Sequence, residues 1–122
     1  MNRCARMIAF VAACLCLLAV ILGALGSHLV EMNGLQETWD TGIRMHLFNA
    51  VGVLGLAALY SRRDTALLKW GAWIIVLGTL LFAGSIYLHV ITGMKISNMA
   101  PAGGTLMMLG WLLAAVGLIR KA

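Results

Sequence analysis

The sequence predicts an all-α membrane protein, a four-transmembrane-helix bundle with both termini on the cytoplasmic side (N-in/C-in) and short loops. The chain of 122 residues is 62% hydrophobic and only 11% charged, whereas a soluble domain is about 45–50% apolar and about 25% charged. Its apolar residues also gather in four runs, each close to the roughly 20 residues that a helix needs to cross a bilayer. We expect a single integral-membrane domain over residues 1–122.

The four predicted helices follow the four apolar runs. The polar breaks between the runs are short, and short loops make consecutive helices antiparallel neighbours. A transmembrane β-barrel is disfavoured, because its strands of about ten residues alternate in polarity, while these runs are apolar on every side. The expected spans are residues 7–27, 41–60, 66–91 and 101–119.

The first span has an alternative interpretation as a cleaved signal peptide. "MNRCARM" suits the charged start of such a peptide, and Ala24 and Gly26 fit a small-residue cleavage pattern. The apolar run is longer than the 7–15 residues usual for a signal peptide, and cleavage would leave an odd number of helices. We therefore expect the span to be retained. Cys4, Cys14 and Cys16 are expected to form neither a disulfide nor a metal site.

The second span carries polar residues in its outer third. The apolar stretch from Leu47 to Tyr60 is about 21 Å long at 1.5 Å per residue, which is too short to cross the hydrocarbon core alone. His46 and Asn49 precede or interrupt this stretch. Because polar groups inside a membrane need partners, we expect both side chains to face protein.

Local signals mark the third and fourth spans, and small residues predict how the helices pack. Asp64 stands where the N-cap of the third span belongs, and Pro101 suits the first turn of the fourth. Small residues at helical spacing allow close approach of backbones in lipid. The expected helix-packing glycines are Gly23, Gly26, Gly78, Gly103, Gly104, Gly110 and Gly117.

The net charge of +5 is explained by topology. With the N-terminus inside, seven of the nine basic residues fall on the cytoplasmic side, in agreement with the positive-inside rule. A nucleic-acid partner is not expected, because no basic face of a folded domain is available. The cytoplasmic basic residues are Arg3, Arg6, Arg62, Arg63, Lys69, Arg120 and Lys121.

Polar side chains of several spans share the outer leaflet and form a candidate site. This candidate polar cluster comprises His28, His46, Asn49, Ser85 and His89. One interpretation is a metal, proton or small-ligand site, because histidine binds metals and titrates near neutral pH. The other is interhelical hydrogen bonding, and it is favoured because the sequence contains no HExxH, CxxC or i,i+4 histidine pair. We expect His28 to lie within hydrogen-bond or one-water reach of the second span, near His46 or Asn49.

Three stretches resemble a known family. They are "GALGSHL", "LGTLLFAGSIY" and "APAGGTLMMLGWL", and together they are similar to the small four-helix membrane proteins of domain-of-unknown-function family 423, which includes the animal transmembrane protein 256. His28 matches the family histidine at the end of the first helix, whereas the family histidine of the second helix falls at Asn49. The resemblance implies a multi-pass plasma-membrane protein and no particular activity.

The sequence thus favours a non-enzymatic structural, accessory or assembly subunit of the inner (plasma) membrane. No catalytic constellation is recognisable, and no cofactor or bound metal is expected. The expected partners are the lipid bilayer and either another membrane protein or further copies of the chain. The alternative function is transport or small-ligand binding at the outer polar cluster.

Overall fold

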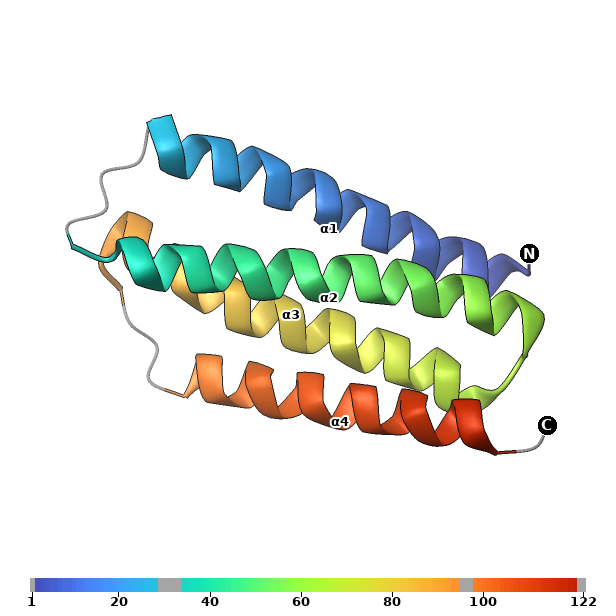
Figure 1. Cartoon of the computed structure of the whole chain (residues 1–122). Helices are drawn as coiled ribbons and strands as arrows, with labels where there is room; N and C mark the ends of the chain where they lie inside the picture. The colour runs from blue at the N-terminus through green and yellow to red at the C-terminus, as the bar shows by residue number, and fades with distance from the viewer. Residues whose placement is uncertain (1, 29–33, 95–97, 121–122) are drawn as a thin grey trace.

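The computed structural model describes residues 2–28, 34–94 and 98–120, and within these ranges it contains four long α-helices (Figure 1). Each is long and apolar enough to cross a membrane. The chain is therefore all-α and multi-pass, as predicted. The helices are α1 (Arg3–His28), α2 (Gln36–Arg62), α3 (Ala66–Thr92) and α4 (Met99–Ile119).

Two helices begin several residues before the apolar runs that predicted them. The first helix starts at Arg3 because Asn2 caps it: the Asn2 Oδ1 atom accepts a hydrogen bond from the Ala5 backbone N–H at 2.7 Å. The second starts at Gln36, and its polar first turns include the fully buried Trp39. Tertiary packing of one apolar residue thus extends a helix through a stretch whose hydropathy favours a loop.

Thr65, rather than Asp64, caps the third helix. The Thr65 backbone is extended, and its side-chain oxygen accepts a hydrogen bond from the Leu68 N–H at 3.2 Å. The prediction of Asp64 was wrong by one residue, because an N-cap oxygen must reach the free N–H groups of the first turn. At the other end, Gly93 adopts φ 79° and donates its N–H to the His89 carbonyl, a left-handed C-cap that suits glycine.

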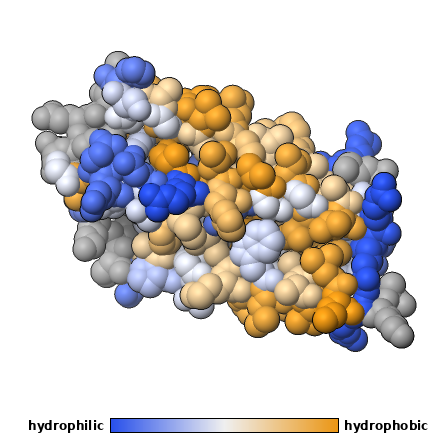
Figure 2. Space-filling model, in the orientation of Figure 1, coloured by the Kyte–Doolittle hydropathy of each residue, from blue (hydrophilic) through white to orange (hydrophobic). Residues whose placement is uncertain are grey.

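The helices pack in chain order, with α1 and α4 on opposite edges of the bundle (Figure 1). The helix α1 packs on α2, α2 packs on α3, and α3 makes its most extensive contact with α4. Both termini lie at one end, which we call the basic end because its described cations are Arg3, Arg6, Arg62, Arg63, Lys69 and Arg120. Figure 2 shows a broad apolar belt on the visible face with hydrophilic residues at both ends, as a transmembrane orientation requires.

Glycines bring the backbones of α3 and α4 together. A Cβ atom at Gly78 would lie 2.7 Å from the Gly103 carbonyl oxygen, and a Cβ at Gly110 would lie 2.9 Å from the Gly71 carbonyl oxygen. A Cβ at Gly117 would meet the Leu67 Cβ at 2.9 Å. No larger residue fits these positions without moving the helices apart.

Gly26 also lies in a contact, since the Trp39 indole of α2 covers it. Gly23 and Gly104 do not: a Cβ at either position would have no atom of the described ranges within 4 Å. The expectation that both pack within the chain is therefore not met. Gly104 follows Gly103 by one residue and points roughly 100° away from it. In α1 the buried small residues are Ala5, Ala12, Ala19 and Gly26.

Candidate functional site

His46 is buried in α2 and hydrogen-bonded to α3. The side chain is 2% exposed, and its Nδ1 atom lies 2.8 Å from the Tyr87 hydroxyl oxygen. The Tyr87 ring also packs against the Trp39 ring, and the two ring centroids are 5.1 Å apart. Burial of the histidine fits the expectation that the polar end of this span faces protein. The hydrogen bond joins α2 to α3.

Asn49 lies almost one turn further along α2 and is bonded to α4. Its Nδ2 atom donates to the Met45 carbonyl oxygen at 2.8 Å and to the Met107 sulfur at 3.0 Å. Its Oδ1 atom accepts from the Trp111 Nε1–H at 2.8 Å. With the side chain 1% exposed, these three hydrogen bonds fix the amide in one orientation and connect two helices that are not adjacent in the chain.

The Trp111 indole reaches Asn49 because Gly52 leaves room for it. A Cβ at Gly52 would lie 2.6 Å from the Trp111 Cζ2 atom. Phe48 flanks the indole, with ring centroids 6.4 Å apart. The local sequence of α2 therefore supplies a hydrogen-bond acceptor in Asn49, an aromatic neighbour in Phe48 and, at Gly52, the space that the Trp111 indole occupies.

Ser85 and His89 belong to α3 and make no direct hydrogen bond to His46 or Asn49 among the described residues. Ser85 is buried, but its hydroxyl donates to the Phe82 carbonyl of its own helix at 2.9 Å. His89 is half-buried, and its Nδ1 atom has no partner in the part of the chain that the structure describes. The structure thus keeps these two residues apart from the hydrogen bonds of α2.

His28 lies outside the cluster. It is the last residue of α1 and is exposed. The expected contact with His46 or Asn49 is absent from the hydrogen bonds of the described residues. Two features explain this. His28 follows the buried Gly26 by two positions, so it points roughly 200° away around the helix. Gly26 is also level with Trp39, about 10 Å along α2 from His46.

The sequence did not predict the partners of His46 and Asn49. A usable signal was present, because buried tyrosine and tryptophan need a hydrogen-bond partner for their O–H or N–H. This signal could not show which helices face one another.

A small cavity adjoins His46. It has a volume of about 70 Å³ between α1, α2 and α3, and its polar lining includes His46, Thr79 and Tyr87. The Thr79 hydroxyl is bonded to the Ile75 carbonyl at 2.7 Å. Among the described residues, no group of three or more His, Cys, Asp or Glu side chains could hold a metal ion. The arrangement can therefore accommodate water but offers no preformed metal centre within the described ranges.

Sequence comparisons place these observations in a family. Residues 22–104 match the family described as "Protein of unknown function (DUF423)". The chain is 34% identical over 105 residues to the UPF0382 inner membrane protein YgdD of Escherichia coli K12, with 83% of this chain and 80% of the relative covered. It is 29% identical over 109 residues to the UPF0382 membrane protein YwdK of Bacillus subtilis, with 85% and 89% covered. No solved structure matches the chain.

The matched residues include the whole of α2 and α3 and the start of α4. They contain His46, Asn49 and Tyr87, and the relatives are named as membrane or inner membrane proteins. Helix lengths, apolar belt and relatives agree on a multi-pass protein of the cell membrane. The chain belongs to the DUF423 family.

Proposed function

We propose that the chain is a non-enzymatic accessory or assembly subunit that receives a transmembrane helix of another membrane protein in a groove between α2 and α4. This α2–α4 groove has a volume of about 440 Å³ and is almost entirely apolar. Phe48 and Met108 line it and are 64% and 69% exposed. Exposed apolar surface is ordinary in lipid, so the groove's shape and one residue in it carry the proposal.

That residue is Gly104. It lines the groove, and a Cβ there would meet no atom of the described residues within 4 Å. Glycine inside a helix costs about 1 kcal/mol relative to alanine, and the described residues leave room for a larger residue at Gly104. Close approach by a helix from outside would use the missing side chain, as small residues do at membrane helix interfaces.

A different protein suits the groove better than a second copy does. A symmetric pair places the same surface of each copy against the other. Two facing grooves would leave their centres unfilled, whereas a separate helix can fill one. The methionines Met45, Met107 and Met108 in the lining suit such an occupant, because methionine adapts to irregular surfaces.

The polar cluster supports a packing role over a chemical one. The Asn49 hydrogen bonds hold α2 and α4 together beneath the groove, and Asn49 itself forms part of the lining. The described hydrogen bonds of His46 and Asn49 end on Tyr87, Met45, Met107 and Trp111. We read these side chains as the supports of a binding surface.

Site-specific photo-crosslinking tests the proposal. A photoreactive residue at Met108, introduced in native membranes, should give one discrete product whose mass differs from that of a homodimer. A protein that co-purifies in mild detergent at fixed stoichiometry should have the mass of this product less the mass of the chain. Gly104→Leu should abolish both, because the leucine side chain would occupy the groove.

Gly23→Leu is the matched control, because Gly23 also has open space around its Cβ position and does not line the groove. It should leave crosslinking and co-purification unchanged. A homodimer at Met108 would assign the groove to a second copy. A product that survives Gly104→Leu would refute the role of the groove.

The alternative, transport or small-ligand binding, is favoured by one observation. The His46 Nε2 atom is buried without a partner among the described residues, next to the cavity of about 70 Å³. A cavity of this size holds only a few water molecules, since each needs about 10–15 Å³ of such volume. Metal analysis of untagged protein separates the functions: metal lost in His46→Gln would favour the alternative.

A further inference from the structure

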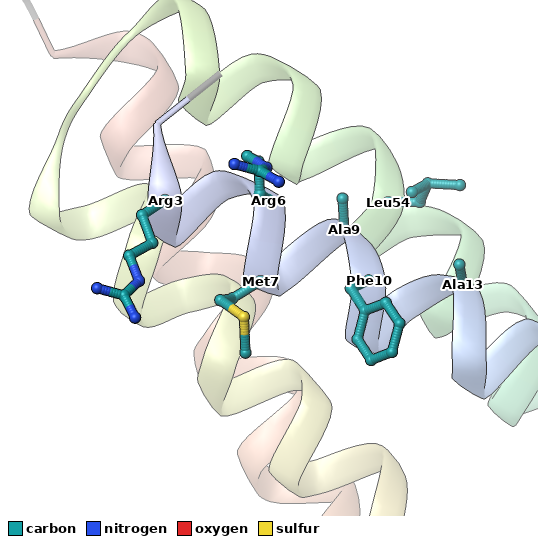
Figure 3. Close-up of a pocket in the computed structure, with 7 residues that line it drawn as sticks. All are labelled: Arg3, Arg6, Met7, Ala9, Phe10, Ala13 and Leu54. Carbon is teal, nitrogen blue, oxygen red and sulfur yellow. The ribbon is translucent and has the colours of Figure 1, made fainter.

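A second groove lies on α1 at the basic end of the molecule. It has a volume of about 660 Å³ and lies on the surface of α1 beside α2 (Figure 3). Ala9 and Ala13 form its floor, while Phe10 on one side and Leu54 of α2 on the other form its walls. Phe10 is 65% exposed and Leu54 41% exposed. The part of the groove that these residues line is thus apolar and open to the lipid.

Two arginines lie at one end of this groove, which we call the α1 groove. Arg3 and Arg6 belong to the first turn of α1 and are exposed, and Figure 3 shows their side chains leaving the helix on different sides of the groove. The first turn contains no acidic residue, and no ion pair with either guanidinium is found among the described residues. The free N–H groups of the helix start add further positive potential.

The combination suits one class of ligand. Arginine binds phosphate oxygens through paired N–H groups, and an apolar groove of this size holds part of an acyl chain. A free anion would leave the apolar walls without a contact, and an uncharged lipid would leave the arginines without an anionic partner. We propose that the α1 groove binds one anionic glycerophospholipid, with its phosphate at Arg3 and Arg6 and an acyl chain between Phe10 and Leu54.

This site is independent of the proposed accessory role, since it shares no residue with the α2–α4 groove. It predicts more than general attraction between basic residues and an anionic leaflet. General attraction depends on the number of charges near the surface. Binding at a specific lipid site depends instead on which arginines are present and on whether the α1 groove is unfilled.

Native mass spectrometry of the detergent-purified chain, titrated with phosphatidylglycerol or phosphatidylcholine, tests the charge requirement. The wild type should retain one phosphatidylglycerol in preference to phosphatidylcholine. Arg3→Gln with Arg6→Gln should weaken this binding by about tenfold or more, as expected for loss of hydrogen bonds to a charged group. The control, Arg62→Gln with Arg120→Gln, removes the same charge from exposed residues outside the groove lining and should retain the lipid.

A second pair of variants tests the α1 groove without changing charge. Ala13→Leu should fill the groove and lower phosphatidylglycerol retention, whereas Ala24→Leu, at an exposed position near the far end of α1, should not. Circular dichroism melting verifies that each variant is folded. Inorganic phosphate at millimolar concentration should not displace the lipid.

Four results would overturn the proposal. Equal retention of the two lipids by the wild type would remove the charge requirement. Equal loss in the two arginine pairs would reduce the effect to general attraction. Displacement of the lipid by inorganic phosphate, or a lipid-free dimer that Ala13→Leu disrupts, would assign the groove to another occupant.

Discussion

At the scale of single residues, the buried polar groups act as connectors between helices. The Asn49 amide uses both of its polar atoms, bonding to Met107 and Trp111 of α4, and His46 bonds to Tyr87 of α3. In lipid, where apolar contact gives little net drive for association, such bonds select which helices meet. They connect α2 to α3 through His46 and α2 to α4 through Asn49.

The bond between Asn49 and Trp111 should be measurable as a coupling energy. Asn49→Leu and Trp111→Phe should each lower stability in detergent, and the double variant should lose less than the sum. We expect a coupling of about 0.6–1.7 kcal/mol, the range for hydrogen bonds between membrane helices. Trp70→Phe is the control, because Trp70 is largely exposed. Strictly additive losses would show that the bond contributes nothing to stability.

The cap of α3 offers a second residue-scale prediction. Thr65→Ala should cost about 1 kcal/mol, because the Leu68 N–H loses its acceptor. Thr65→Ser keeps the oxygen and should restore most of the loss. Thermal unfolding of the three proteins in the same detergent is the measurement. A larger loss in Asp64→Ala than in Thr65→Ala would contradict the observed cap.

At the scale of elements, α3 and α4 form the closest pair, and α1 is the least buried of the four helices. Glycine backbones meet across α3 and α4 at Gly71, Gly78, Gly103 and Gly110. By contrast, α1 uses a heptad row of small residues on one face and leaves the remainder to lipid. The difference arises because glycine permits contact between two backbones, while an alanine methyl keeps them further apart.

Gly110→Leu and Gly23→Leu should therefore have opposite outcomes. The first places a side chain where a Cβ alone would lie 2.9 Å from the Gly71 carbonyl oxygen, and overpacking of this kind costs roughly 1–3 kcal/mol. The second enters open space and gains helix propensity, so it should be neutral or slightly stabilising. Thermal unfolding in detergent distinguishes them. Equal melting temperatures would mean that α3 and α4 separate easily.

At the scale of the whole molecule, the distribution of charge predicts the orientation. Both termini lie at the basic end (Figure 1), and the leaflet facing that end should be cytoplasmic. Reporter fusions after Ala122 and in the connection between α1 and α2 should report opposite sides, with the C-terminal reporter inside. An exported reporter after Ala122 would reverse the orientation, and the anionic lipid site would then face the outer leaflet.

Hydropathy and segment length predicted the fold class, the number of helices and most of their extent, because both properties act locally along the chain. It also identified His46 and Asn49 as buried, since a polar group within an apolar span has few alternatives. Residue spacing on a single helix indicated only approximately which face carries the small residues. The predicted set therefore contained Gly26, which contacts Trp39, together with Gly23, which has open space around its Cβ position among the described residues.

The hydrogen-bond partners of His46 and Asn49 became known only from the packed bundle. Tyr87 and Trp111 lie 41 and 62 residues from the groups they bind, and their placement depends on the rotation and depth of three helices at once. His28 shares the outer leaflet in the sequence yet points away from α2, because depth along a helix does not specify direction around it. The two grooves arise in the same way, from the relative rotation of packed helices, which no single segment encodes.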